Sequence, residues 1–434
     1  MELVIAFLIL LVTIVIGVPV VYAFGAATIW MVFSLGYDAS FVFTTIYSKM
    51  NSVVLLAIPL FIILGAIMEK GGVGSALVEF VESFIGRMKG ALCAVASVAC
   101  AVFGAICGSG AATLSCIGSI LAPKMRERKY PMGVAAAVLA CAAPIGMLIP
   151  PSSIQILFAW SGNLSVLTCF LATVVPGIIL TILIGICGMV MCKKSKDIVT
   201  TESMPRDVWL RKTGKSTVNA VPALIMPLIV LGGIYGGYMT PSEAAGVAII
   251  YAIPVSILVY KGMKLKDMGS TLRDSACTTG VIMCMLGTIM VVSRILVMHN
   301  VPSTILDMLM EVSGNNKYII LLMINIFMVI IGMLMDDVSG TLLVTPILLP
   351  IGTALGLSPY HIAAILGVNL GMGNVTPPTA PFLYLSARIC KVDTSAIMKP
   401  MLTILLFAYL PTLILTTYIP EISLWLPRLI MGEV

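Results

Sequence analysis

Glycine, proline, serine and threonine residues interrupt long apolar segments of the chain at four places. Two interruptions, Cys107–Thr113 and Asp336–Thr341, are rich in Gly, Ser and Thr, and we call them tip 1 and tip 2. The other two, Pro144–Ser152 and Gly371–Thr379, contain adjacent prolines, and we call them break 1 and break 2. A broken helix leaves carbonyl and amide groups free, which persist at membrane depth only where they line a cavity or bind something. The oxygens suit sodium, whereas the amino end of a half-helix suits a carboxylate.

The elements that position these residues belong in lipid. Of the 434 residues, 60% are apolar and 10% are charged, against roughly 45–50% and 25% in soluble chains. Apolar stretches that fit a ~30 Å hydrocarbon layer recur along the whole chain. The net charge of +6 resides in short basic stretches between apolar segments, which indicates topology signals rather than nucleic-acid binding. We therefore expect an all-α polytopic membrane protein that contacts the lipid bilayer and no nucleic acid.

The two halves of the chain contain the same elements in the same order. About 42 residues separate Gly108 of tip 1 from Pro150, and about 38 separate Ser339 of tip 2 from Pro377. Several Lys and Arg residues flank the base of the first hairpin, whereas only Lys317 flanks the second. The positive-inside rule then places the two bases on opposite faces of the membrane. This predicts an inverted-topology repeat with two re-entrant helical hairpins and two discontinuous helices, which usually serves alternating access.

The return arms of the two hairpins are expected to be short, at Leu114–Pro123 and Leu342–Pro350. The chain then divides into six expected parts. These are 1–88, scaffold helices and an interfacial arm; 89–162, the first half of a transport domain; 163–217, a connecting helix and a basic cytoplasmic linker; 218–314, scaffold helices and a second arm; 315–392, the second half of the transport domain; and 393–434, a C-terminal helix.

Candidate substrate-binding residues follow from the tips and the breaks. They are Ser109, Gly110, Thr113, Ser152, Ser339, Gly340, Thr341 and Thr379. Each residue taken singly is explained equally well as a helix kink or a small-residue packing contact, so the hypothesis rests on the set. The adjacent carboxylates of Asp336 and Asp337 fit either a proton relay or a helix-terminal or interfacial role.

Motifs of other protein classes are missing from the sequence. The eleven cysteines form no CxxC pair, and Cys93, Cys100 and Cys107 recur every seven residues, which favours close helix packing over a metal site. There is no HExxH motif and no P-loop, and Gly108–Gly110 lacks the wider motif of an intramembrane serine protease. We expect no enzyme and no direct use of ATP.

Seven segments together are characteristic of one family. They are Pro59–Gly65, Gly108–Gly110, Gly146–Ser152, Tyr238–Gly246, Gly332–Asp336, Thr345–Pro350 and Thr376–Pro378. Through them the chain resembles, over nearly its full length, the large membrane subunit of tripartite ATP-independent periplasmic (TRAP) transporters. The resemblance implies an elevator-type, Na+-driven importer in the bacterial cytoplasmic membrane. Its substrates would be organic acids, such as C4-dicarboxylates or sialic acids, that a periplasmic substrate-binding protein delivers. A small membrane subunit would pack beside it.

The resemblance also implies sodium ligands, which are mostly backbone carbonyls. They are Cys107, Gly110, Gly146, Ile149 and Pro150 in the first half, and Gly332, Gly373 and Thr376 in the second. The chain departs from the family pattern at Cys107 and Gly110, where serines are frequent, and at Pro381 and Arg388, which follow break 2. A stand-alone anion:sodium symporter of related fold, without a binding protein, is the alternative.

Overall fold

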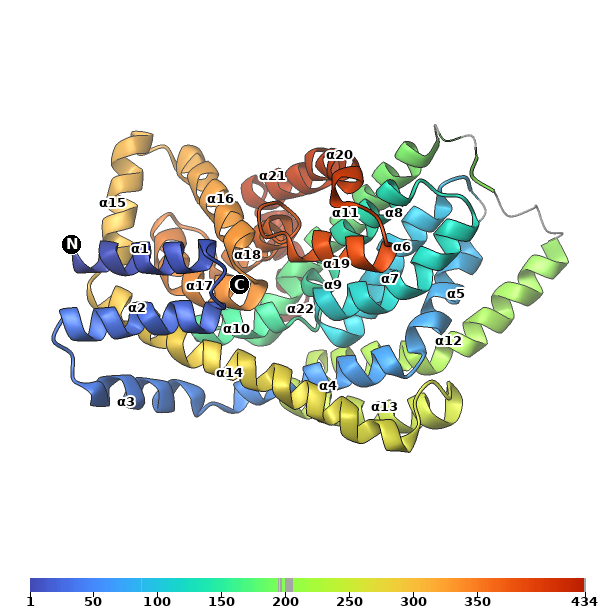
Figure 1. The fold of residues 1–434 in the computed structure, drawn as a ribbon, viewed down its shortest axis with the longest axis horizontal. Helices are drawn as coiled ribbons and strands as arrows, with labels where there is room; N and C mark the ends of the chain where they lie inside the picture. Colours follow the sequence, from blue (N-terminus) through green and yellow to red (C-terminus); the bar gives the residue numbers. More distant parts are fainter. Residues whose placement is uncertain (87, 194, 196, 200–205, 433–434) are drawn as a thin grey trace.

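The computed structural model describes residues 1–86, 88–193, 195, 197–199 and 206–432. In these ranges the regular structure is helical, and the helices form an elongated bundle (Figure 1). Eight helices of the described part are long and apolar enough to cross a membrane, or nine if one bent pair counts as a single span. The prediction of an all-α polytopic membrane protein is therefore confirmed.

The first half of the chain contains eleven α-helices. They are α1 (Glu2–Val15), α2 (Val20–Ser34), α3 (Ala39–Met50), α4 (Ala57–Lys70), α5 (Val73–Ile85), α6 (Ala91–Cys107), α7 (Gly110–Glu127), α8 (Met132–Ala142), α9 (Ile145–Leu148), α10 (Ser153–Gly162) and α11 (Val166–Lys193). Helices α6 and α7 form a hairpin whose turn is Gly108-Ser109. Gly108 has a φ of 63°, a left-handed conformation that glycine adopts without strain.

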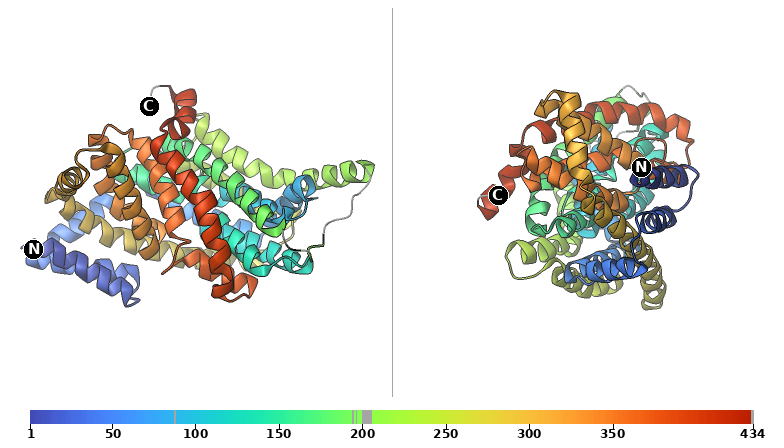
Figure 2. Two further views of the ribbon diagram at one scale, coloured as in Figure 1. Left: turned by 90° about the horizontal axis from the view of Figure 1, so that it is seen from above. Right: turned by 90° about the vertical axis from the view of Figure 1, so that its left-hand side faces the viewer.

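The described part of the second half also contains eleven α-helices. They are α12 (Arg206–Tyr235), α13 (Pro241–Pro254), α14 (Met268–Met298), α15 (Val301–Ser313), α16 (Lys317–Leu334), α17 (Asp337–Ala354), α18 (Pro359–Gly373), α19 (Pro381–Cys390), α20 (Thr394–Ile404), α21 (Leu410–Tyr418) and α22 (Glu421–Met431). The α1–α3 segment and the start of α12 lie at opposite ends of the long axis (Figure 2).

Helix contacts between the two halves are reciprocal. Helix α2 packs against α14 of the other half, and α13 packs against α4. In the same way α10 packs against α17 while α19 packs against α7, and α11 packs against α18 while α20 packs against α8. Each contact between a helix of the first half and a helix of the second half thus has a counterpart, in which the equivalent helices of the opposite halves meet. This packing agrees with an internal repeat.

Four expected boundaries differ in the structure. The return arms are longer than predicted, because α7 and α17 have 18 residues each. Their polar first turns are helical, since Thr113 and Thr341 donate hydrogen bonds to carbonyls four residues earlier. Helix α12 begins at Arg206, so the end of the predicted linker is helical. Residues 194, 196 and 200–205 of that linker, and Arg87 at the base of the first hairpin, lie outside the described residues.

The other two differences concern α14 and the C-terminal segment. The stretch 261–274 has the basic composition that is typical of a cytoplasmic connector, but α14 begins at Met268 and so includes Asp274. The predicted C-terminal helix is continuous from Thr394 to Tyr418, through α20, a π-helical turn at Leu405–Tyr409 and α21, and α22 follows as a separate helix. Pro400 and Pro420 are among the residues that cannot donate a backbone hydrogen bond there.

Candidate functional site

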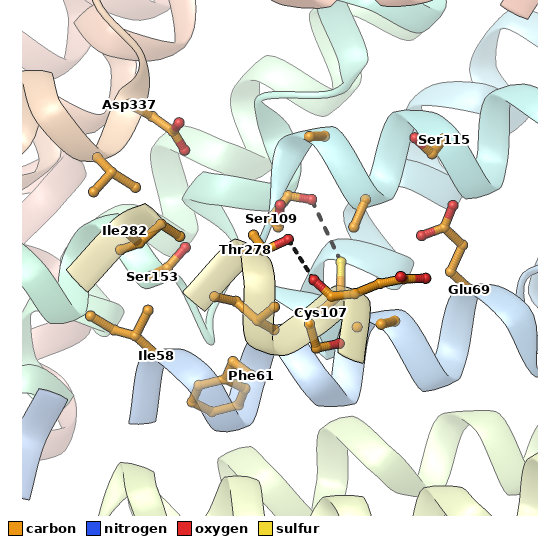
Figure 3. A pocket seen from close by; sticks show the side chains of 18 of the residues that line it. Ile58, Phe61, Glu69, Cys107, Ser109, Ser115, Ser153, Thr278, Ile282 and Asp337 are labelled. Atoms are coloured by element: carbon orange, nitrogen blue, oxygen red, sulfur yellow. Dashed lines mark hydrogen bonds between the residues drawn. The ribbon is translucent and has the colours of Figure 1, made fainter. Parts of the chain in front are cut away.

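A cavity of about 420 Å³ lies where both tips approach α4 and α14. Helix α4 contributes residues from Ile58 to Lys70, and α14 contributes residues from Asp274 to Ile282. Tip 1 and the start of α7 contribute Cys107, Ser109 and Ser115, among others, while Ser153 begins α10. Tip 2 contributes Asp336, Asp337 and Val338. We call this cavity the tip cavity (Figure 3).

The tip cavity is lined by more acidic than basic side chains. Its charged residues are Glu69, Lys70, Asp274, Asp336 and Asp337. The Lys70 ammonium lies 3.2 Å from a carboxylate oxygen of Asp274, so this ion pair joins α4 to α14 at the cavity. In Figure 3 the side chains of Glu69 and Asp337 lie on opposite sides of the view, with Ser109 and Thr278 between them. The site can therefore hold cations, and it offers an anion one ammonium group.

Tip 1 packs directly against break 1. A Cβ atom on Gly104 would collide with the Cα atom of Gly146, so the two backbones touch. The Gly108 carbonyl accepts hydrogen bonds from the backbone N–H and the hydroxyl of Ser153, at 3.4 and 3.0 Å. A Cβ atom on Gly146 would also lie 2.6 Å from the Thr113 hydroxyl oxygen. The only side chain that fits at Gly104 and Gly146 is a hydrogen atom.

Tip 2 packs against break 2 in the same way. A Cβ atom on Gly373 would lie 2.5 Å from the Cα atom of Gly332. The Thr379 hydroxyl donates to the carbonyl of Met333 at 2.5 Å, and its backbone N–H lies 3.4 Å from the same oxygen. A glycine contact therefore joins each hairpin to its own break, at 104/146 in one half and at 332/373 in the other.

The structure places the predicted substrate-binding residues in three different surroundings. Only Ser109 of that set lines the tip cavity. Four hydroxyl residues are fully buried and donate to carbonyls of their own segments: Thr113, Ser152, Ser339 and Thr341. Gly110 and Gly340 are buried packing positions, since a Cβ would meet Phe382 and Leu370 respectively. Thr379 is exposed.

The predicted sodium ligands gather at the two contacts between a tip and its break. Cys107 ends α6, and its thiol lies 3.3 Å from the Thr113 hydroxyl. Ile149 and Pro150 belong to the non-helical turn between α9 and α10. In the second half, the Thr376 hydroxyl donates to the Met372 carbonyl at 2.7 Å, one residue before Gly373. In the described part of the chain, no group of three or more His, Cys, Asp or Glu residues is arranged to hold a metal ion.

Asp336 is the N-cap of α17. One of its carboxylate oxygens accepts from the backbone N–H groups of Val338 and Ser339 at 3.1 and 3.4 Å, and the other accepts from the Ser339 hydroxyl. This hydrogen bonding confirms the helix-terminal role for Asp336. Asp337 is the first residue of α17 and lines the tip cavity.

Sequence reasoning missed several residues of the site. Asn374 of break 2 is fully buried, and neither its amide oxygen nor its amide nitrogen has a hydrogen-bond partner. Its oxygen is thus available to a ligand beside Gly373 and Thr376. Glu69 and Asp274 were also missed. Their signal was an acidic residue beside or within a long apolar segment, which by itself indicates a functional site.

The chain is similar to known transport proteins over most of its length. Residues 7–422 match the family described as tripartite ATP-independent periplasmic transporter, DctM component. The chain is 34% identical to the C4-dicarboxylate TRAP transporter large permease protein DctM of Pseudomonas aeruginosa, covering 86% of each chain. The chain belongs to the DctM family of TRAP transporters. It is therefore a transport permease subunit of the bacterial inner membrane and not an enzyme.

Other relatives of this DctM-family permease are named after different substrates. It is 32% identical to the isethionate TRAP transporter permease protein DctMQ of Oleidesulfovibrio alaskensis, covering 95% of this chain and 64% of that protein. It is 27% identical to the sialic acid TRAP transporter large permease protein SiaM of Vibrio cholerae, covering 96% of both. Among solved structures, the Alcanivorax borkumensis YdaH transporter is similar, with a TM-score of 0.63, 14% identity and 90% of both chains covered. That likeness concerns the fold alone.

Proposed function

We propose that this DctM-family permease imports small organic acids by sodium-coupled symport, with a periplasmic substrate-binding protein delivering the substrate. C4-dicarboxylates, sialic acids and isethionate are the candidates, because relatives carry these names. A small membrane subunit would complete the transporter, as in the TRAP family. Residues 89–162 and 315–392 would form the transport domain, with their hairpins re-entering the membrane from opposite faces, and residues 1–88 and 218–314 would form the scaffold.

The observation that carries the proposal is the charge of the tip cavity. Four carboxylates and one ammonium line it, so an organic anion enters against net negative charge. A cation that binds near the tips lowers this repulsion, and the energy of the sodium gradient is thereby coupled to anion binding. Cation binding would thus precede or accompany the organic acid.

The neutral oxygens at the tips and breaks fit sodium. The unpartnered amide oxygen of Asn374 lies in break 2, among the residues predicted as the second sodium site. Carbonyls of a broken helix are known sodium ligands in transporters with inverted repeats. Gly373 and Thr376 would supply carbonyl or hydroxyl oxygens there, and Gly146, Ile149 and Pro150 would do so at break 1.

Packing between the proposed domains is consistent with an elevator movement. A Cβ atom on Gly65 of α4 would lie 3.2 Å from the Cβ atom of Cys107 at tip 1, so the scaffold meets the tip through small groups. Small residues allow helices to approach closely and present few side chains that interlock. The proposed transport domain could then slide along α4.

The test is uptake by the complete transporter. The chain would be reconstituted in liposomes with its small subunit and binding protein, and uptake of labelled succinate, isethionate and sialic acid would be measured with and without an inward sodium gradient. We expect uptake of one of them only with both sodium and the binding protein. Uptake that ignores the sodium gradient contradicts the coupling, and uptake without the binding protein favours a stand-alone symporter.

A further inference from the structure

A second cavity of about 420 Å³ lies near the end of α14 that is remote from Asp274. Lys49 of α3, Ser293 and Arg294 of α14, Ser161 of α10 and Pro346 of α17 are among its lining residues. Helix α14 contacts both α3 and α17, and α17 contacts α10, so the four helices that supply these residues are neighbours (Figure 1). We call it the basic cavity.

The positive-inside rule, applied to α14 and to α11, places the basic cavity on the outer face of the membrane. Helix α14 starts after a connector with Lys261, Lys264 and Lys266, and Arg294 lies near its other end. Ser161 lies just before α11, which runs to a basic end at Lys193. Basic connectors mark the cytoplasmic face, so the cavity lies on the opposite one. Lys and Arg residues are usually depleted on that face, so the presence of two cations there requires another reason.

Among the described residues, the two cations of the basic cavity have no acidic partner. No carboxylate is among the described residues that line it. The ion pairs within 4.0 Å in the described part of the chain involve other residues than Lys49 and Arg294. The tip cavity, at the other end of α14, has the opposite charge balance.

The guanidinium of Arg294 is held in place from one side. Its Nη1 donates to the hydroxyl of the buried Thr45 at 3.1 Å, and its central carbon lies 5.1 Å from the centroid of the Phe41 ring. These contacts fix the plane of the group and leave further N–H donors free. A fixed guanidinium suits a carboxylate, which it binds through two parallel hydrogen bonds. The hydroxyls of Ser161 and Ser293 add neutral donors in the same cavity.

We propose that the basic cavity is an anion site that receives the carboxylate of an organic acid on the outer face, before the acid reaches the tip cavity. The order of the two sites rests on the proposed import function, whereas anion binding itself does not. Lys49 and Arg294 belong to the proposed scaffold segments, and Ser161 and Pro346 belong to the proposed transport domain. The site therefore lies at the junction that has to open for the substrate to pass.

The test places a reactive thiol in the basic cavity. Ser161→Cys would be combined with Cys277→Ser and Cys284→Ser, which remove the two exposed native thiols. Purified protein in detergent would be treated with an anionic and a cationic methanethiosulfonate reagent, with and without succinate. We expect the anionic reagent to react at least about threefold faster, because two nearby positive charges attract it. Succinate should slow the reaction, and Arg294→Gln or Lys49→Gln should remove both effects.

Lys317→Gln is the matched control, because Lys317 is a cation of the second hairpin base that does not line the basic cavity. It should leave the reagent preference and the succinate protection unchanged. Protection that survives both Arg294→Gln and Lys49→Gln overturns the proposal. So does protection by phosphatidylglycerol without protection by succinate, since the cavity would then bind a lipid headgroup.

Uptake by the reconstituted transporter separates this site from the proposed function. Arg294→Gln should raise KM at least about threefold and leave the maximal rate nearly unchanged, because one charge near the anion is lost. An unchanged KM overturns the order of sites. If the wild-type transporter takes up no organic acid while succinate still protects the introduced thiol, the import function fails and the anion site is supported.

Discussion

Replacement of Gly373 by alanine tests whether the hairpin and break of the second half form one packed unit. The added Cβ would lie 2.5 Å from the Cα atom and 2.6 Å from the carbonyl carbon of Gly332, and 3.0 Å from the Met333 nitrogen. Ordinary carbon contacts are about 3.5–4.0 Å, so the two backbones must separate by about 1 Å. Overpacking of this kind costs about 1–3 kcal/mol of unfolding free energy.

The assay is unfolding of the purified protein by SDS in mixed micelles. Gly280→Ala is the matched control, because Gly280 lies inside α14 and a Cβ there meets nothing within 4 Å. It should be neutral or stabilising by up to about 1 kcal/mol, the helix propensity difference between the two residues. Gly373→Ala should also raise the sodium concentration for half-maximal uptake, since the carbonyls of break 2 move. If Gly373→Ala unfolds at the same SDS fraction as the control, the close-contact argument is refuted.

Three other substitutions test separate contacts. Asp336→Ala removes the N-cap of α17 and should lower the free energy of unfolding by about 1–2 kcal/mol, whereas Asp336→Asn should retain most of the stability. SDS unfolding measures both variants, and equal losses would contradict the capping role. Glu82→Gln removes an ion pair to Lys124 at 3.1 Å and should cost about 1 kcal/mol at pH 7. Burial raises the pKa of Glu82, but Lys124 and a neighbouring arginine outweigh this effect and hold the pKa below the ordinary 4.5. The stability difference between the wild type and Glu82→Gln should therefore vanish as the pH falls below that value. Lys70→Gln removes the one ammonium of the tip cavity and its ion pair with Asp274. The KM for substrate should rise severalfold, while the stability to SDS should stay nearly unchanged because the ion pair is half exposed. An unchanged KM would exclude Lys70 from anion binding.

The positions of the tips and breaks could be predicted because the signals are local. Glycine permits the left-handed turn at Gly108, and proline removes a helix donor wherever it stands. Likewise, Pro19 is the N-cap of α2 and separates this helix from α1. The length of the return arms was wrong for a local reason as well. The hydroxyls of Thr113 and Thr341 bond back to their own helices, and polarity alone does not distinguish such a turn from a loop.

The lining of the tip cavity could not be predicted because it depends on packing between distant helices. Glu69 and Asp274 are about 200 residues apart in sequence, and nothing near either residue indicates that α4 and α14 lie side by side. The sequence also left the direction of each hydroxyl open. Ser109 lines the cavity, whereas Ser339 of the corresponding tip bonds to the Asp336 cap. Equivalent residue types in the two halves therefore have different partners.

The two halves are nevertheless joined to their breaks by the same device, and this bears on how the protein would move. The glycine contacts at 104/146 and 332/373 leave no space between the two backbones, because any side chain there would collide with backbone atoms. The reciprocal contacts of α10 with α17 and of α19 with α7 then tie the two hairpins to each other's breaks. Across the tip cavity, by contrast, α4 meets tip 1 at Gly65, and Asp274 of α14 lines the cavity. We therefore expect any relative movement to occur between α4 with α14 on one side and the tips on the other. The boundary between these two groups of helices contains both the acidic tip cavity and the basic cavity, so a shift along this boundary would change the two sites together.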